Sequence, residues 1–184
     1  IETLWTLWLP LAMTLAHQKK ALGRPLIQGV LGGQGTGKTT LTTVLTAILN
    51  RMGYRVCGFS IDDIYKTYGD RQQLMETDPR LKWRGPPGTH DVALGLSLLQ
   101  QVKQSNGASP IAIPRFDKSL HGGAGDRTSP EVIDGADIVL FEGWFVGTRP
   151  VDPAVFDQAP PPIITEGDRQ FARDMNERLR DYLP

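Results

Sequence analysis

A glycine-rich stretch near the start of the chain limits the possible folds more than any other feature. It carries the pattern G-x-x-x-x-G-K-T from Gly32 to Thr39. An apolar run over residues 25–31 precedes it, and apolar residues at helical spacing follow it over residues 41–52. A strand, a glycine loop and a helix in this order bind phosphate, because the loop and the helix N-terminus direct N–H groups at the anion. The pattern therefore predicts a nucleotide-binding loop.

The glycines of this loop allow the backbone to turn with positive φ and to approach a ligand closely. We expect Lys38 to contact the β- and γ-phosphates of ATP and the Thr39 hydroxyl to bind Mg²⁺. An ordinary glycine-rich turn is the alternative, but the flanking strand and helix patterns disfavour it. The predicted nucleotide-binding residues are Gly32, Gly33, Gln34, Gly35, Thr36, Gly37, Lys38, Thr39 and Thr40.

Three apolar runs are expected to form the core strands, at residues 26–31, 55–61 and 137–142. They alternate with helical patterns, which favours the α/β class and a mostly parallel sheet of the P-loop NTPase type, with helices on both faces. A length of 184 residues suits a single domain. Three strands are few, because a sheet has about five or six on average.

Helical spacing of apolar residues predicts a helix over residues 4–15, kinked or restarted at Pro10. A second helix is expected to begin after Thr89 as its cap and to stop at residues 106–107. The last helix of the chain is expected to carry on one face Phe171, Met175, Leu179 and Leu183.

Between these helices, residues 111–113 predict a short strand that Pro114 breaks. A loop rich in glycine and charge is expected to follow, continuing through Arg127.

Composition argues against several classes of protein. Lys plus Arg equals Asp plus Glu, with 20 residues in each pair and no long run of one sign, so we expect no nucleic-acid partner. The apolar stretch at residues 4–15 is too short to span a bilayer, so no membrane partner is expected. The single cysteine, Cys57, excludes an intramolecular disulfide framework and suits a reducing compartment. We therefore expect a cytoplasmic protein.

Acidic residues follow two of the expected core strands. Asp62 and Asp63 come after the second strand, and Glu142 ends the third. Open α/β sheets bind their ligands at the carboxyl ends of the strands. A kinase needs a carboxylate for the acceptor hydroxyl and another near the metal, and we assign these roles to Asp62 and Glu142. The alternation of side chains cannot decide between Asp62 and Asp63, because both faces of such a sheet are covered.

Two loops supply charge that could converge over the same site and hold a small anionic acceptor. Any one of these residues is more often a surface residue, but the group lies in loops bounded by glycine. Together with Asp62, the predicted acceptor-binding residues are Arg84, His90, Asp91, Arg115, Lys118 and Arg127.

Seven segments of the chain together match a known family of kinases, at residues 32–40, 60–65, 84–85, 88–91, 114–119, 125–127 and 140–144. The first is shared by many nucleotide-binding proteins, whereas the Arg-Phe-Asp-Lys-Ser and Gly-Asp-Arg segments are much more specific. Through these segments the chain resembles the D-glycerate 3-kinase family, which lies within the larger group of phosphoribulokinase, uridine kinase and bacterial pantothenate kinase. The matching segments span most of the chain in the family's order.

The resemblance implies ATP-dependent phosphorylation of the 3-hydroxyl of D-glycerate, with Mg²⁺. In the larger group, the aspartate that opens the D-x-x-Y segment is the base, which favours Asp62 over Asp63. The glutamate of the F-E-G segment, here Glu142, lies near the metal. The expected catalytic residues are thus Lys38, Asp62 and Glu142, and the expected metal ligands are Thr39 and Glu142.

Members of the family continue beyond the position that matches Pro184, with a lid bearing arginines and further strands. We therefore expect residues 1–184 to form a single P-loop kinase domain that is incomplete at its carboxyl end, catalytically weak and prone to associate. The amino end also starts with Ile1 rather than Met.

Two other functions fit the sequence. One is a kinase of the same group with uridine, pantothenate or a sugar phosphate as acceptor, because loop geometry rather than residue type decides the acceptor. The other is a non-catalytic nucleotide-binding regulatory module. A GTPase switch is disfavoured, because the chain has no N-K-x-D motif.

Overall fold

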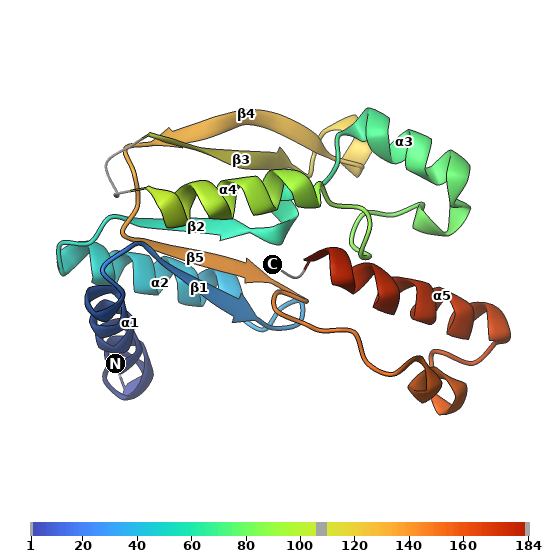
Figure 1. Ribbon diagram of the computed structural model, residues 1–184, viewed down its shortest axis with the longest axis horizontal. Helices are drawn as coiled ribbons and strands as arrows, with labels where there is room; N and C mark the ends of the chain where they lie inside the picture. Colours follow the sequence, from blue (N-terminus) through green and yellow to red (C-terminus); the bar gives the residue numbers. More distant parts are fainter. Residues whose placement is uncertain (1, 106–109, 183–184) are drawn as a thin grey trace.

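A parallel sheet of three strands lies at the centre of the computed structural model, which describes residues 2–105 and 110–182. The strands are β1 (Leu26–Leu31), β2 (Val56–Ser60) and β5 (Ile138–Gly143), in the order β1-β5-β2 (Figure 1). The three expected core strands and the α/β class are therefore confirmed. Because β5 lies in the middle, the phosphate loop after β1 and the chain after β2 flank its carboxyl end.

Helices cover both faces of this sheet, as the sequence predicts. Helices α1 (Leu9–Leu22) and α2 (Lys38–Arg51) pack on one face, and α4 (Val92–Gln104) packs on the other, in front of the sheet in Figure 1. The core on the first face consists of Ala12, Leu15, Ala16, Leu26, Leu45, Leu49, Ile138 and Leu140. The core on the second face includes Phe59, Leu98, Val102, Ile111, Ile113 and Val139.

The amino-terminal helix starts as a π-helix, Leu4–Trp8, and continues as α1. Pro10 lies in the first turn of α1, where its missing N–H would have no helical partner. The expected kink or restart at Pro10 is therefore seen as a change from π-helix to α-helix, one residue before the proline. The helix ends at Gly23, whose φ of 64° suits a residue without a Cβ. Within the described part of the chain, no helix has the length and apolar character needed to cross a bilayer.

The antiparallel hairpin of β3 (Ile111–Asp117) and β4 (Asp126–Ile133) corrects two sequence predictions. The strand does not end at Pro114 but runs on to Asp117, and Arg127 lies in β4 rather than in a loop. The pairing shifts register at Pro114, and such an irregularity accommodates a residue that cannot donate to the ladder. The hairpin forms a sheet separate from the parallel one.

The cap of α4 also differs from the prediction. Asp91 caps the helix by accepting a hydrogen bond from the Leu94 N–H, 3.0 Å away. Thr89 is buried instead, and its hydroxyl donates to the Pro86 carbonyl at 2.7 Å. The expected helix end at residues 106–107 lies outside the described residues.

Helices α3 (Tyr68–Thr77) and α5 (Glu166–Arg178) lie beyond the carboxyl end of the sheet (Figure 1). Leu179, expected in the last helix, lies in the 3₁₀ turn Leu179–Tyr182 that follows it, and Leu183 falls outside the described residues. The remaining 3₁₀ turns are Ile61–Ile64, Pro79–Leu81, His121–Gly123 and Pro153–Gln158.

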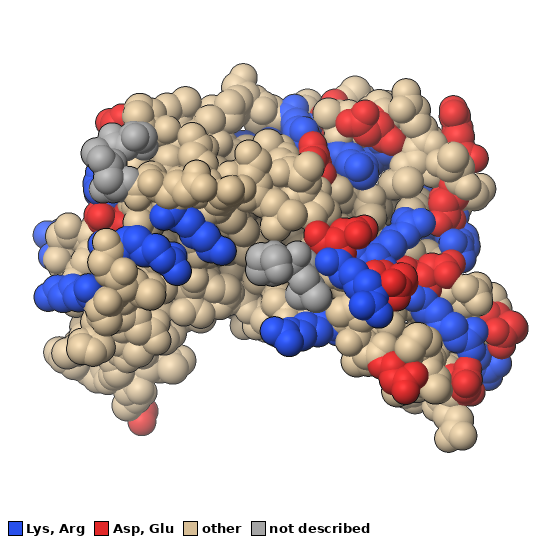
Figure 2. All heavy atoms as spheres, in the orientation of Figure 1, with Lys and Arg blue, Asp and Glu red and all other residues tan. Residues whose placement is uncertain are grey.

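Ion pairs hold α5 against the turn that follows α3. Arg178 lies 3.0 Å from Asp78, and Arg80 lies 2.7 Å from Asp174. Figure 2 shows Lys and Arg side chains interspersed with Asp and Glu at this end of the molecule. These contacts position the 3₁₀ turn that carries Tyr182, which reaches back to the segment between α3 and α4.

Candidate active site

The phosphate loop has the backbone that its glycines predict. Gly35 and Gly37 have φ angles of 76° and 85°, which side chains with a Cβ rarely adopt. At Gly32 a Cβ would lie 2.8 Å from the Thr36 hydroxyl oxygen, so only glycine allows this close approach. The loop thus leaves a cradle that larger side chains would fill.

Helix α2 begins directly after this loop. Its N-cap, Gly37, provides no side-chain acceptor, so the first N–H groups of the helix are not capped by a side chain. The Lys38 ammonium folds back over the loop and donates to the Gly33 carbonyl at 2.9 Å. Free helix N–H groups, a cation and a glycine cradle together suit the phosphates of a nucleotide.

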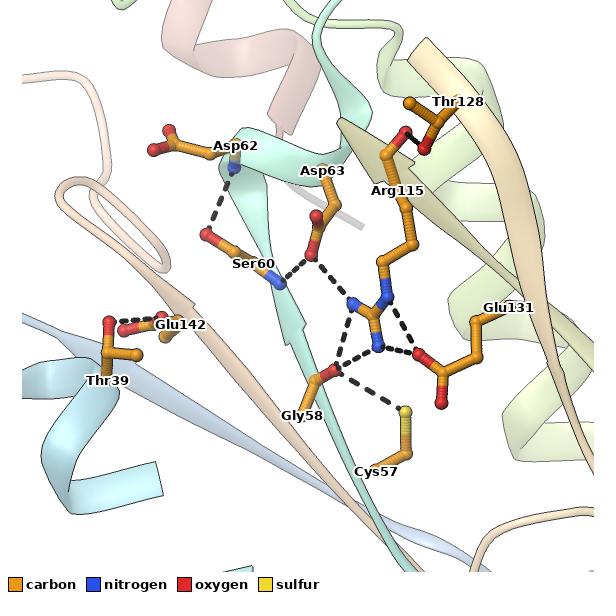
Figure 3. Close-up of polar contacts among 10 residues, drawn as sticks. All are labelled: Thr39, Cys57, Gly58, Ser60, Asp62, Asp63, Arg115, Thr128, Glu131 and Glu142. Atoms are coloured by element: carbon orange, nitrogen blue, oxygen red, sulfur yellow. Dashed lines mark hydrogen bonds and ion pairs between the residues drawn. The ribbon is translucent and has the colours of Figure 1, made fainter. Parts of the chain in front are cut away.

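A hydroxyl and a carboxylate meet beside this loop. Thr39 Oγ1 donates to Glu142 Oε1 at 2.9 Å (Figure 3). The second oxygen, Glu142 Oε2, is buried and has no hydrogen-bond partner among the described residues. Oxygen ligands of this kind suit Mg²⁺, which keeps several waters and nucleotide oxygens and needs only one or two protein groups. No cluster of three or more His, Cys, Asp or Glu suitable for a metal occurs in the described ranges.

Asp62 lies in the 3₁₀ turn Ile61–Ile64, directly after β2. The Lys118 ammonium, from the end of the β3–β4 hairpin, lies 2.6 Å from Asp62 Oδ2. Burial alone would raise the pKa of Asp62, but the bond and charge of Lys118, with smaller effects of Tyr65 and His90, outweigh it and lower the pKa below its ordinary value. Asp62 is therefore a carboxylate at neutral pH and accepts hydrogen bonds.

Asp63 points to different partners (Figure 3). Its Oδ2 accepts from the Ser60 N–H at 2.9 Å, which completes a capping box, and lies 3.0 Å from the Arg115 guanidinium. Burial raises the pKa of Asp63, and the Ser60 N–H and Arg115 offset this only in part. The two neighbouring aspartates thus occupy separate environments.

The predicted catalytic residues Lys38, Asp62 and Glu142 border one cleft of about 580 Å³ at the carboxyl ends of the parallel strands. Five of the nine predicted nucleotide-binding residues line it, whereas Gly32, Thr36, Gly37 and Thr40 do not. Open α/β sheets bind ligands at this place. The cleft is lined by Gly33, Gln34, Gly35, Lys38, Thr39, Ser60, Asp62, Tyr65, Arg84, Gly85, Lys118, Glu142, Gly143 and Trp144.

Comparisons with known proteins find similar kinases. The chain is 35% identical over 179 residues to the uncharacterized kinase mug58 of Schizosaccharomyces pombe, covering 92% of this chain and 64% of that protein. It is 33% identical over 147 residues to a chloroplastic D-glycerate 3-kinase of Arabidopsis thaliana, covering 76% and 32%. A solved D-glycerate 3-kinase structure from Cryptococcus neoformans matches with a TM-score of 0.85 at 29% identity, covering 96% of this chain and 68% of that chain. The chain is similar to P-loop kinases of this group over most of its own length.

The resemblance noted from the sequence is thereby confirmed. No protein-family model matches the chain. The chain spans only part of the length of each of these relatives.

Of the six acceptor-binding residues predicted alongside Asp62, the fold brings Arg84 and Lys118 to the cleft. Arg84 Nη1 donates to the carbonyls of Gly123 and Ala124, at 2.6 and 3.1 Å. Its Nε and Nη2 groups have no partner among the described residues. This side of the guanidinium can therefore donate hydrogen bonds to a ligand in the cleft.

The other four predicted acceptor-binding residues make contacts within the fold. Arg127 donates to the Tyr65 carbonyl and lies 2.8 Å from Asp91, which caps α4. Arg115 is paired with Asp63 and Glu131. His90 is 1% exposed, and burial lowers its pKa to about 4, so the ring is neutral at pH 7.

Three residues near the site were not singled out from the sequence. Tyr65 lines the cleft, and its ring stacks on His90 with centroids 4.4 Å apart. Tyr182 accepts from the Gly88 N–H at 2.8 Å and hydrogen-bonds to His90 Nδ1 at 2.9 Å. Arg71 is buried and bonds the carbonyls of Lys66, Ala124 and Gly125. The D-x-x-Y spacing could have indicated Tyr65, but no local pattern marks the other two.

Proposed function

We propose that this chain transfers the γ-phosphoryl group of ATP to the 3-hydroxyl of D-glycerate. One observation carries the proposal: the phosphate loop and Asp62 border one cleft, whose other cations are Arg84 and Lys118. The similar plant and fungal proteins are D-glycerate 3-kinases, which supports this acceptor. We also propose a cytoplasmic location, because the single cysteine, Cys57, is unpaired and suits a reducing compartment.

The donor side of the cleft fits Mg²⁺–ATP. The glycine cradle at Gly32 and the uncapped start of α2 would receive the phosphates, with Lys38 beside them. Thr39 and the unpartnered Glu142 Oε2 would hold Mg²⁺, directly or through water. When bound, Mg²⁺ would add positive charge that stabilises the transferring phosphoryl group.

On the acceptor side, Asp62 would orient the hydroxyl and take its proton. The acceptor oxygen would then form a bond to the γ-phosphorus, while the bond from that phosphorus to the bridging oxygen breaks and ADP leaves with the electron pair. Lys118 keeps Asp62 deprotonated and fixes its carboxylate.

Arg84 is the residue proposed to hold the acceptor carboxylate. Its Nη1 contacts to Gly123 and Ala124 fix the side chain, and the Nε and Nη2 groups present two parallel donors. A carboxylate fits this fork, which lysine cannot reproduce.

The test measures ADP release with glycerate, uridine, pantothenate and ribulose 5-phosphate as acceptors. Turnover is expected with glycerate. Arg84→Lys should raise the KM for glycerate by roughly 10- to 100-fold, the loss of one charge-assisted hydrogen bond, and leave the KM for ATP unchanged. Arg127→Lys is the matched control, because Arg127 is paired away from the cleft. Faster turnover with another acceptor, or equal effects of the two variants, would contradict the assignment.

A further inference from the structure

All three nitrogen atoms of the Arg115 guanidinium donate hydrogen bonds within the fold. Its Nε and Nη2 donate to Glu131 Oε2 at 3.0 and 2.8 Å, and its Nη1 donates to Asp63 Oδ2 at 3.0 Å. Nη1 and Nη2 also donate to the Gly58 carbonyl, both at 3.3 Å (Figure 3). A guanidinium has five N–H donors, so Arg115 has no donor left for a substrate.

These bonds join parts of the chain that backbone pairing does not join. The β3–β4 hairpin is a separate sheet, and among the described residues no backbone hydrogen bond links it to β2. Apolar packing of Ile111 and Ile113 attaches the hairpin to the core. The Arg115 guanidinium binds the Gly58 carbonyl at the edge of β2, which otherwise accepts only a long 3.5 Å hydrogen bond from the Cys57 thiol among the described residues.

The two segments that Arg115 joins also carry the two partners in the cleft. Asp63 directly follows Asp62 in the 3₁₀ turn after β2, and Lys118 lies three residues after Arg115. The distance between Asp62 and Lys118 therefore depends on how the hairpin sits against β2. We propose that Arg115 is a positioning residue that holds Lys118 against Asp62. This inference rests on the proposed function for its effect on rate, but the geometry can be tested without turnover.

Arg115→Lys is the informative substitution. Lysine retains the positive charge but cannot bind Gly58, Asp63 and Glu131 simultaneously, so the hairpin would lose its attachment to the β2 edge. The groups that face Asp62 are Lys118, Tyr65, His90 and the neighbouring Asp63. Lys118 is the one whose placement Arg115 sets, and its displacement would remove the largest of the effects that lower the pKa of Asp62 against burial.

The first measurement is the titration of the Asp62 carboxyl by ¹³C NMR, with Asp62→Asn used to identify its signal. Arg115→Lys is expected to raise the pKa of Asp62, as is the positive control Lys118→Met. Arg55→Lys is the matched control, because Arg55 makes a similar fork to Asp137, at 3.1 Å for both bonds, at the opposite end of the strands. It is expected to leave the pKa of Asp62 unchanged.

The second measurement is kinetic. Arg115→Lys should lower kcat by roughly 10- to 100-fold, the loss expected when a catalytic group is misplaced, with the KM for ATP unchanged. Glu131→Gln removes one partner at a half-exposed position and should cause the same changes to a smaller extent.

An unchanged Asp62 titration in Arg115→Lys, with Lys118→Met shifted, would overturn the inference and leave Arg115 a purely structural role. If the wild-type protein turns over none of the four acceptors, the proposed function fails, whereas the NMR comparison still decides the role of Arg115.

Discussion

At the scale of single residues, the site is governed by which partner each charged side chain meets. Asp62 is bound by Lys118 and borders the cleft, whereas Asp63 completes a capping box and binds Arg115. Two adjacent carboxylates therefore differ in the direction of their pKa shifts, lowered for Asp62 and raised for Asp63. We therefore expect the isosteric variant of Asp62 to affect catalysis and that of Asp63 to affect stability.

Asp62→Asn should lower kcat by about 10²–10⁴, the usual contribution of a positioned base, with little change in the free energy of unfolding. Asp63→Asn should instead lower the free energy of unfolding by roughly 1–3 kcal/mol, because it weakens a mostly buried ion pair. Steady-state kinetics and urea unfolding of both variants provide the comparison. If Asp63→Asn has the larger effect on kcat, the base lies one residue later.

The pH dependence of the reaction should report the Asp62–Lys118 pair. Because the folded-state pKa of Asp62 is lowered, the pair stabilises the fold above the ordinary aspartate pKa of about 3.9, and the stabilisation is lost as pH falls through the lowered value. Removing the ammonium removes the largest effect that opposes burial, so the pKa of Asp62 rises. In Lys118→Met the acid limb of kcat/KM should therefore move to higher pH. An acid limb at the wild-type position would show that Lys118 does not control Asp62.

The sequence predicts some of these residues better than others, for a physical reason. The phosphate loop and the acidic strand ends depend on local patterns, so Lys38, Glu142 and the pair Asp62 and Asp63 could be proposed in advance, whereas the choice of Asp62 came from the family resemblance. The three arginines could not be separated, because a guanidinium's role depends on partners far along the chain. Glu131 and Asp63 occupy Arg115, and Asp91 occupies Arg127, whereas Arg84 has donors with no partner in the described part of the chain.

At the scale of elements, the β3–β4 hairpin is the part that sequence patterns describe least well. Pro114 marks the end of a strand in an isolated pattern, but here the register shift in the pairing with β4 accommodates it. The turn that joins the two strands carries Lys118, and Arg71 from α3 bonds the carbonyls of Ala124 and Gly125 in it. The conformation of this turn therefore affects where Lys118 lies in the cleft.

Gly125→Ala should destabilise this turn. Gly125 has a φ of 75°, and a Cβ would lie 2.4 Å from Phe116 Cε1. We expect a loss of roughly 1–3 kcal/mol in the free energy of unfolding from overpacking and strain. Gly122→Ala is the matched control, because it has a φ of 64° but no atom within 4 Å of the added Cβ. Thermal and urea unfolding should show the larger loss for Gly125→Ala, and equal losses would mean that Phe116 moves aside without cost.

At the scale of the whole molecule, the parallel sheet is asymmetric. β5 is paired on both edges, and the guanidinium of Arg115 covers the Gly58 carbonyl of β2. β1 pairs with β5 on one edge, and no strand within the described ranges pairs with the other. An open strand edge presents N–H and C=O groups that can pair with another chain.

We therefore expect the 184-residue chain to associate through the outer edge of β1 as its concentration rises. Leu31, at the end of this strand, is 59% exposed and adds apolar surface to the same edge. Leu31→Lys should reduce association, because a lysine at a strand edge opposes pairing with another strand. Leu120→Lys is the matched control, since Leu120 is 39% exposed but lies outside the parallel sheet. Light scattering over a range of concentrations measures the molar mass of each form. A wild-type chain that stays monomeric throughout, or equal effects of the two lysines, would show that the edge of β1 does not drive association.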